Sequence, residues 1–507
     1  LSVPSGVSII GTVGAIQDET DSSVVDAGGT ARMFVQPAAG SSIVLDSLVM
    51  RNAKGVTLDM ANTTSATIKD SVITGVTYVS GEGAIAHYYP GTAVTTTLNL
   101  TRTTVRDISR VAANTNSYLI KLKGPGSGTA SALNVNGCLF KNIAVGTIEG
   151  KSGFIRCETV NGTFTDSIFE NISWAYSGTW AIEESGGIWV YNKPMVVERC
   201  TFRNIVGGCA LLQNNRQTIT CRNNVFYAIN VGIRGVYRPF YYTGTVHNCT
   251  FDNCSSVVSI DGYVSSPTAL YNCSISNCTR LALGLGNGSD TKPKLFNVNI
   301  VNTDATGNYG YDTVVSTAIT SFEPRYVNPA SGDYRLKRSS ELIDIGSNAN
   351  SAGITTDLAG TARVLDGNGD SVAIVDLGAY EYNPVPAVPT FLSELPIYEV
   401  FAGGSVTVPV RIVPPAQSAV EAAVTCGDDL SAPSTLSFPD GEGPVARRRT
   451  GDRLGTAADL DPRQRPPHAR GACGPSARAQ SEPRARRSAR LRMDRLSAHA
   501  HRARHRR

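Results

Sequence analysis

The sequence predicts an all-β fold in which short parallel strands wind into a solenoid, and two regularities carry this prediction. A large apolar residue recurs ten times, at intervals of 23 to 35 residues, and we call this set the marker column. Another apolar residue stands five positions before each marker, and this set is the partner column. Self-similarity with a period of 20 to 50 residues is typical of a solenoid. The marker column is Met50, Ile73, Val105, Phe140, Phe169, Phe202, Phe226, Phe251, Ile275 and Ile300, and the partner column is Leu45, Ile68, Leu100, Val135, Phe164, Val197, Cys221, Val246, Leu270 and Leu295.

Two corners per coil follow from the spacing of these columns. An uninterrupted strand keeps inward residues at even spacing, so an offset of five predicts a corner between partner and marker. Asn stands two positions after the marker in seven of the ten turns. Because Asn tolerates the left-handed backbone of a sharp bend, we place the second corner there. These residues are Asn52, Asn142, Asn171, Asn204, Asn253, Asn277 and Asn302.

Residues 1–310 resemble the right-handed parallel β-helix repeat family, which has the pectate-lyase-like architecture. The repeat is clearest where residues 246–254 reappear as residues 270–278, each with Asn-Cys near its start and its end. The resemblance implies coils stacked at the inter-strand spacing of about 4.8 Å. An α-solenoid would need helix-length patterns with a period of 3.6, and the sequence has none.

Composition agrees with a secreted β protein of low charge. The chain has 49 Gly, 17% charged and 41% hydrophobic residues. No apolar run reaches 18 residues, so the sequence predicts no membrane span. The overall charge of +4 hides a division: residues 447–507 hold 18 Arg and five acids, a net of +13, which leaves residues 1–446 at −9.

The two ends of the chain suggest a fragment. Residues 447–507 contain no Ile, Val, Phe, Tyr, Trp, Asn or Lys, and cannot bury a core. A basic arm for nucleic acid is one interpretation. We favour a disordered Arg/Ala/Pro-rich tail from a frameshift, and therefore expect no nucleic-acid partner. Leu1 is no initiator methionine and no signal peptide is visible, so we expect missing N-terminal coils of a longer, monomeric secreted protein.

Three long intervals between markers are the candidate binding regions. They run from Ile73 to Val105, from Val105 to Phe140 and from Phe169 to Phe202. Extra residues in a coil form loops, and loops on a rigid scaffold often carry binding chemistry. Aromatic faces beside carboxylates suit sugar rings, although the aromatics could merely cover the coils beneath. The predicted carbohydrate site is Tyr88, Tyr89, Trp174, Tyr176, Trp180, Glu183 and Glu184, with Glu82, His87, Tyr118, Lys121, Lys123, Trp189 and Tyr191 in the same regions.

Two further ladders have structural explanations that we prefer. Lys141, Glu170 and Arg203 each follow a marker, and we expect alternating ion pairs there rather than a basic stripe for an acidic polysaccharide. Cys249 and Cys273 occupy equivalent rungs. Their parallel Cβ atoms should lie about 4.8 Å apart, beyond the 3.5–4.5 Å of a disulfide, so we expect a buried thiol ladder.

Catalytic signatures are mostly missing. Asn302-Thr303-Asp304 matches one element of polygalacturonases, but their other elements and the pectate-lyase Arg-x-Pro-x-x-Arg element are absent. The catalytic residues are therefore unknown. The sequence favours an extracellular or bacterial cell-surface protein that binds a polysaccharide or cell-surface glycan, or acts as an adhesin or stalk. The alternative is a polysaccharide lyase or glycoside hydrolase acting on an acidic polysaccharide.

Residues 324–382 include Pro324-Arg325-Tyr326-Val327-Asn328-Pro329, Leu342-Ile343-Asp344-Ile345-Gly346 and Asp376-Leu377-Gly378-Ala379-Tyr380-Glu381-Tyr382. On these they resemble the C-terminal segment of large bacterial surface β-helix proteins, and we place the whole segment at residues 311–383. A solenoid must cover its last coil, and we assign this segment to that role as a cap. Within it, Asp366, Asn368 and Asp370 are spaced like the oxygen ligands of a calcium loop, and Asp376 stands near the position of the last ligand. Calcium is the cofactor that this spacing suggests, and a plain Asp/Gly/Asn turn is the alternative.

Beyond the cap, residues 384–390 form a Pro-rich linker. Residues 391–446 resemble part of a Calx-β or similar immunoglobulin-like domain, on the alternating segment Val406-Thr407-Val408-Pro409-Val410 and on Leu436-Ser437-Phe438-Pro439. We therefore expect a partial β-sandwich before the tail.

Overall fold

The structure is a computed structural model that describes the solenoid and its cap more fully than the C-terminal region. Between residues 390 and 492 the description is limited to the backbone of short strands. The described residues are 6–11, 22–30, 32–35, 41–60, 63–78, 82–88, 95–109, 118–125, 131–145, 153–174, 186–208, 210–215, 217–231, 235–240, 244–260, 268–284, 292–306, 312–313, 315–384, 390–393, 397–401, 408–413, 420–423, 435–438, 456–457 and 488–492.

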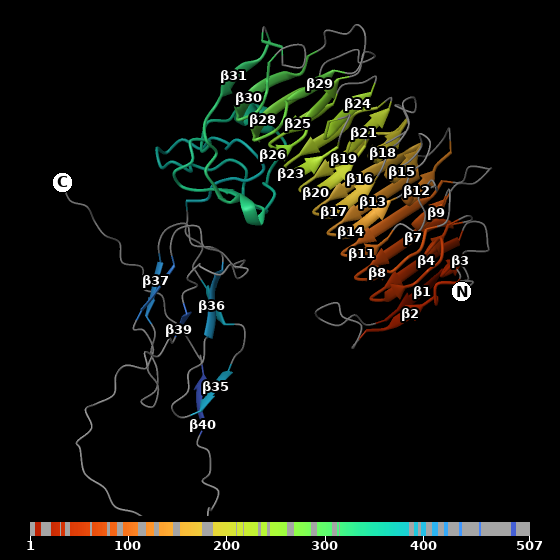
Figure 1. Cartoon of the computed structure of the whole chain (residues 1–507). Helices are drawn as coiled ribbons and strands as arrows, with labels where there is room; N and C mark the ends of the chain where they lie inside the picture. The colour runs from red at the N-terminus through yellow and green to blue at the C-terminus, as the bar shows by residue number, and fades with distance from the viewer. Residues whose placement is uncertain are drawn as a thin grey trace, which may run out of the picture. The chain divides into compact units, whose positions relative to one another are not determined.

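The predicted right-handed parallel β-helix is confirmed. Parallel strands stack coil on coil in one 21-stranded sheet, which bends at the corners (Figure 1). No α-helix occurs among the described residues. The strands of this sheet are β1 (Val7–Ile10), β2 (Val24–Asp26), β4 (Ser41–Asp46), β5 (Val49–Arg51), β7 (Thr63–Lys69), β8 (Val72–Thr74), β10 (Thr97–Thr101), β11 (Thr104–Ile108), β13 (Ser131–Asn136), β14 (Leu139–Val145), β16 (Val160–Thr165), β17 (Ile168–Trp174), β19 (Met195–Glu198), β20 (Thr201–Gly207), β22 (Ile219–Arg222), β23 (Val225–Asn230), β25 (Thr245–His247), β26 (Thr250–Cys254), β28 (Ala269–Ser276), β30 (Lys294–Val301) and β31 (Thr317–Thr320).

A second parallel sheet, of ten strands, closes each coil, and the repeat pattern did not predict it. Its inward residues, among them Ile120, Ile155, Ile188 and Leu212, lie on consecutive rungs and pack into the same core. The number of residues between each of these strands and the preceding strand of the larger sheet varies, so no constant spacing marks them in the sequence. They are β3 (Phe34–Val35), β6 (Leu58–Asp59), β9 (Gly83–Tyr88), β12 (Tyr118–Lys123), β15 (Gly153–Glu158), β18 (Gly186–Tyr191), β21 (Leu212–Asn215), β24 (Tyr237–Phe240), β27 (Val258–Ile260) and β29 (Ala282–Gly284).

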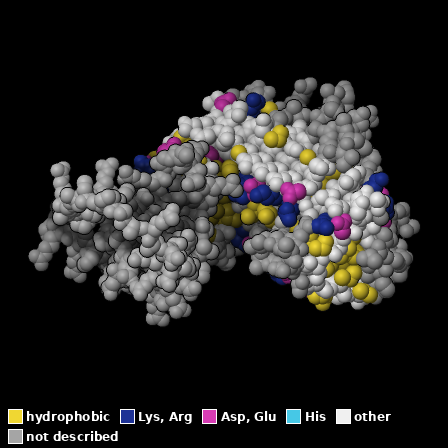
Figure 2. Space-filling model, turned by 60° about the horizontal axis from the view of Figure 1, so that its bottom comes forward, with side chains coloured by type: hydrophobic (Ala, Val, Ile, Leu, Met, Phe, Trp, Pro, Cys, Tyr) yellow, Lys and Arg dark blue, Asp and Glu magenta, His cyan; other side chains and the backbone are white. Residues whose placement is uncertain are grey.

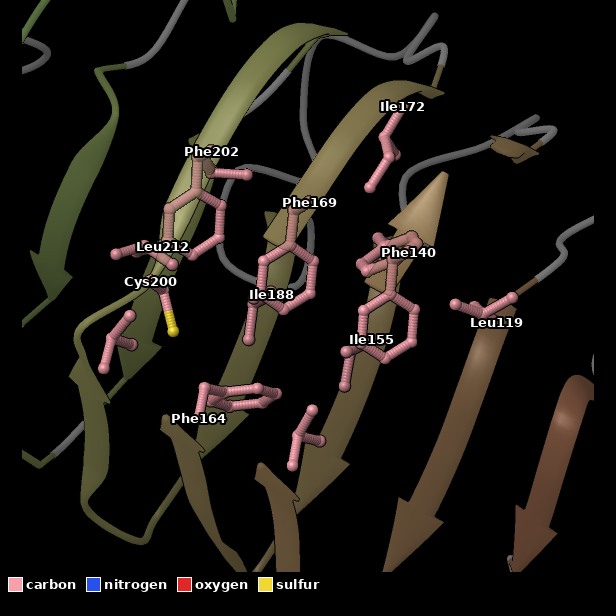
Figure 3. Packing of buried hydrophobic residues seen from close by; sticks show 14 of the residues in the cluster. Leu119, Phe140, Ile155, Phe164, Phe169, Ile172, Ile188, Cys200, Phe202 and Leu212 are labelled. Carbon is pink, nitrogen blue, oxygen red and sulfur yellow. The ribbon is translucent and has the colours of Figure 1, made fainter. Parts of the chain in front are cut away.

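Both predicted columns lie in the interior and in the predicted register. Met50 pairs with Ile73, and the pairing continues rung by rung to Ile275 and Ile300. Within the marker column, the ring of Phe169 stacks on Phe140 at 4.9 Å and on Phe202 at 4.7 Å between centroids (Figure 3). Burial of each such side chain contributes roughly 1.5–3 kcal/mol, and each aromatic pair about 0.5–1.5 kcal/mol more.

The corners adopt the left-handed backbone that the Asn pattern predicts. All seven predicted Asn residues have positive φ, from 48° at Asn302 to 59° at Asn52. The corner between the columns obeys the same rule, because the residue two positions after each partner is also left-handed, as at Asp70 and Asn272. At the corner after the marker column, side-chain amides also link successive coils: Asn171 Nδ2 donates to Asn142 Oδ1 at 3.0 Å.

The outward ladder beside the marker column consists of alternating ion pairs, as expected. Glu170 lies 2.7 Å from Arg203 and 3.9 Å from Lys141 between the charged atoms. Figure 2 shows a face of the rod on which basic and acidic side chains lie next to one another. These positions therefore neutralise each other along the rod.

The eight described cysteines are buried free thiols, which agrees with the predicted thiol ladder. Cys221 Sγ and Cys249 Sγ lie 3.9 Å apart, too far for a disulfide bond. Burial raises the pKa of Cys138 to about 11 and that of Cys200 to about 12. Since the thiolate is the reactive form, these side chains act as core residues.

The predicted cap lies mainly along the side of the last coils. Only β31 extends the stack, pairing in parallel with β30. The segment from Tyr334 onwards packs against the outer faces of β22 to β30, and its residues Leu342 and Leu377 share a small apolar cluster with Val225 of β23. Its remaining elements are β32 (Tyr326–Asn328), the 3-10 helix η2 (Pro329–Ser331), β33 (Asp333–Leu336) and the 3-10 helix η3 (Asn348–Ser351).

The C-terminal region contains antiparallel strand pairs, the pairing from which a sandwich is built. β34 pairs with β36, β37 with β38, β36 with β39 and β35 with β40. The strands are β34 (Thr390–Ser393), β35 (Ile397–Phe401), β36 (Val408–Val413), β37 (Val420–Ala423), β38 (Thr435–Phe438), β39 (Thr456–Ala457) and β40 (Ser488–Arg492). The domain boundaries at residues 384, 391 and 447 stay predictions, as does the frameshift origin of the tail.

The stacked ring of Phe169 should be far more important to stability than its neighbour. We expect Phe169→Ala to lower the free energy of unfolding by about 3–5 kcal/mol, because it opens a cavity between Phe140 and Phe202. Ile168→Ala is the matched control, since Ile168 is 38% exposed, and it should cost less than about 1 kcal/mol. Urea unfolding followed by circular dichroism measures both, and equal losses would contradict the interior stack.

Candidate functional site

The long intervals converge on one face of the ten-stranded sheet. Their strands β9, β12 and β18 are neighbours of one another or of β15, which lies between β12 and β18. Lys121, Arg156 and Trp189 occupy consecutive outward rungs, and Lys123, Glu158 and Tyr191 form a second row beside them. We call these six residues with Tyr118 the platform.

Arg156 is the centre of the platform. Its guanidinium carbon lies 5.7 Å from the Tyr118 ring centroid and 5.0 Å from that of Trp189. Arg156 Nη1 donates to Tyr118 Oη at 3.2 Å, and Arg156 Nε donates to Glu158 Oε1 at 2.9 Å. All three of Tyr118, Arg156 and Trp189 are buried, so they form a rigid base.

The rim of the platform is partly open to solvent. Lys121, Lys123, Glu158 and Tyr191 are all half-buried. The Tyr191 ring stacks on Trp189 with centroids 5.5 Å apart and planes 14° apart. Burial lowers the pKa of Lys121, and the positive charge of Arg156 lowers it further, against the opposing effects of Glu158 and Glu82. The rim therefore combines two cations, one carboxylate and one aromatic ring.

An acidic cluster lies at one end of the same sheet face. Arg32 forms ion pairs with both Asp59 and Glu82. Asp59 lies on the outward row that continues through His87 to Lys121. The face thus changes from acidic to basic along the rod.

The structure places the predicted carbohydrate residues in three different ways. Trp174 lies in the core, 3% exposed, where its indole packs against Gly187 and Gly207. Its ring has no face for a ligand, so we leave it out of the proposed site. Tyr88 ends β9, and only its backbone is described. Tyr89, Tyr176, Trp180, Glu183 and Glu184 lie outside the described residues.

Sequence reasoning missed Arg156 and Glu158. The segment Ile155-Arg156-Cys157-Glu158 alternates apolar and charged residues, as a half-buried strand does. This signal was available, but the interval around it is of ordinary length. Tyr118, Lys121, Lys123, Trp189 and Tyr191, by contrast, were all placed in the long intervals.

The residues of the predicted calcium loop are occupied by main-chain hydrogen bonds. Asp366 accepts from the N–H groups of Gly369 and Ser371, at 2.7 and 2.8 Å. Asp376 is buried, and its two oxygens accept from Asp344 N and Tyr382 N, at 2.8 and 2.5 Å. Over the described ranges, no three His, Cys, Asp or Glu side chains are placed to hold a metal ion. These hydrogen bonds are those of an Asp/Gly/Asn turn, and the calcium site stays a prediction.

The fold and the platform define a parallel β-helix protein with a charged and aromatic face on its ten-stranded sheet. No protein-family model matches the chain, and no curated protein is significantly similar to it. The described part of the chain includes no helix long and apolar enough to cross a membrane.

Calcium should leave the stability of the cap unchanged. A site filled at a hundredfold excess over its Kd would stabilise the fold by about 2.7 kcal/mol. Because Asp376 already satisfies both oxygens within the protein, we expect no shift in Tm between calcium and a chelator. Differential scanning calorimetry checks this, and a rise in Tm with calcium that Asp366→Asn removes would restore the calcium loop.

Proposed function

We propose that this chain is an extracellular or cell-surface β-helix protein that binds an acidic polysaccharide on the platform. Its affinity for such a chain also suits an adhesin or a stalk. The resemblance of residues 1–310 to the pectate-lyase-like superfamily, and of residues 391–446 to a Calx-β domain, supports a secreted location. We propose a monomer, since the repeating coils complete the core within one chain.

The observation that carries the proposal is the clustering of the platform on adjacent rungs. Lys121 and Lys123 offer charge to carboxylates, while Glu158 accepts hydrogen bonds from hydroxyl groups. Tyr191 offers an aromatic ring backed by Trp189. Arg156 is held between two rings and by Glu158, so these side chains are ordered before a ligand arrives, which limits the entropy lost on binding.

Binding should depend on the rim of the platform. We expect Lys121→Ala and Tyr191→Ala each to weaken binding to a uronate oligosaccharide at least tenfold, a change of about 1.4 kcal/mol. Lys69→Ala is the control, because Lys69 is a half-exposed cation that pairs with Asp46 on the other sheet. Isothermal titration measures the three affinities. Equal affinities for all three variants and the parent chain would refute the proposal.

A lyase is the second candidate, and the environment of Lys121 favours it. Burial and the positive charge of Arg156 lower the pKa of Lys121, a direction that favours the neutral amine, which can accept a proton. The base would take the proton from the carbon next to a uronate carboxylate, and Lys123 would neutralise the charge of that carboxylate. The electron pair then forms a carbon–carbon double bond, and the glycosidic oxygen leaves with the electrons of the broken bond and takes a proton from water.

The two candidates give different products. A lyase releases unsaturated uronates that absorb in the ultraviolet, whereas a binding protein leaves the chain intact. If activity is found, Lys121→Gln should abolish it while Lys69→Ala keeps it. Binding without any absorbance change would leave the platform as a recognition surface only.

A further inference from the structure

Residues 334–382, which we call the clasp, meet the last coils through a mostly polar interface with one apolar contact, at Val225 and Tyr227 of β23. Asn223, Asn248, Asn272 and Asn297 stand at equivalent corners of four successive coils, all with left-handed backbone. The first three are buried under the clasp with no exposed surface. We call these four residues the asparagine ladder.

The asparagine ladder binds mainly the main chain of the clasp. Asn223 Nδ2 donates to Thr356 O at 2.7 Å, and Asn272 Nδ2 donates to Ser347 O at 2.9 Å. Asn272 Oδ1 in turn accepts from Ser347 N at 2.8 Å. The Asn side chains thus hydrogen-bond the main chain of the clasp, as a neighbouring β-strand would.

Other polar groups of the rod complete the interface. Tyr334 Oη donates to Asp252 Oδ2 at 2.8 Å, and Ala379 N donates to Thr250 Oγ1 at 3.0 Å. His247 Nδ1 lies 2.8 Å from Asn350 O. Such a surface, rich in Asn, Asp, Thr and His, would be well hydrated if the clasp moved away.

Each partner has its own stabilising contacts. The clasp has an apolar cluster that includes Leu336, Leu342 and Leu377, to which the rod contributes Val225 and, packed against it, Tyr227 of β23. It also has an internal ion pair, with Arg363 Nη1 3.2 Å from Glu381 Oε2 and both side chains almost fully buried. The rod beneath keeps its ladder, because β22, β25, β28 and β30 hydrogen-bond to one another.

We propose that the clasp detaches from the rod as a unit while the coils beneath it stay folded. The interface is mostly polar, like the interfaces between domains that move relative to one another. Opening uncovers the asparagine ladder, a surface built to bind an extended main chain. The six earlier coils lack such a ladder: the equivalent corners there carry residues such as Asp70 and Arg102, which pair with each other at 2.6 Å.

Hydrogen exchange of the full chain tests the proposal. The amides of Ser347 and Ala379 should exchange at least about tenfold faster than core amides such as those of Phe202 and Phe226, since a sub-global opening precedes global unfolding. Equal rates in the clasp and the rod would overturn the proposal.

Two glycines provide a matched pair of variants. A Cβ on Gly378 would lie 2.7 Å from Thr250 Oγ1 and 3.4 Å from Ser274 Cβ of the rod. A Cβ on Gly360, which also has positive φ, would meet nothing within 4 Å. We expect Gly378→Ala to speed exchange in the clasp about tenfold beyond Gly360→Ala, with the rod amides unchanged in both.

Two outcomes would contradict this expectation. Equal acceleration by both variants would mean that backbone strain inside the clasp, and not its docking, sets the opening. Acceleration of the rod amides together with the clasp would mean that the two unfold as one body. Asn248→Ala, which removes the bond from Ser351 Oγ at 2.9 Å, gives an independent check if Gly378→Ala fails to fold.

Discussion

The fold depends on a left-handed residue placed two positions after each inward residue of both columns. In an L-amino acid this conformation costs about 1–2 kcal/mol, and every coil needs it twice. Asn and Gly reduce the cost, but Arg102, Arg199 and Ala228 also adopt it. Arg199 is held by an ion pair to Asp166 at 2.7 Å, whereas Ala228 has only its place between β20 and β26. Stacking between neighbouring coils therefore holds these residues in the left-handed conformation, and the left-handed residues in turn allow the chain to bend into coils that stack.

The sequence alone was enough to predict the two columns and the seven Asn corners. A buried residue at a constant offset is directly readable, as the run from Phe140 to Phe251 illustrates. The ten-stranded sheet could not be predicted from the sequence, because β12 and β18 follow the preceding strands of the larger sheet after unequal numbers of residues. Docking of the cap was equally hidden: Asn223 and Arg363 bond across 140 residues of chain, and nothing in their local sequence links them.

In the candidate site, the sequence pattern does not predict in which direction each side chain points. Trp174 and Trp189 belong to the same long interval, yet one packs over Gly207 inside the coil and the other stacks on Tyr191 outside it. A tryptophan in a loop region gives no sign of its direction until strand ends are known. Arg156 shows the opposite case, since a residue from an ordinary coil holds the residues of the long ones together.

Because the rod is built from one coil after another, the number of coils fixes the distance between any two sites along it. Each coil contacts only its two neighbours, so a coil duplicated between β19 and β22 would leave the platform and the asparagine ladder unchanged internally. It would move them apart by about 4.8 Å and turn one slightly relative to the other. The distance between the platform and the asparagine ladder is thus set in discrete steps, by the number of coils. Duplication of coils would therefore change the distance between the platform and the asparagine ladder while the residues of both stay the same.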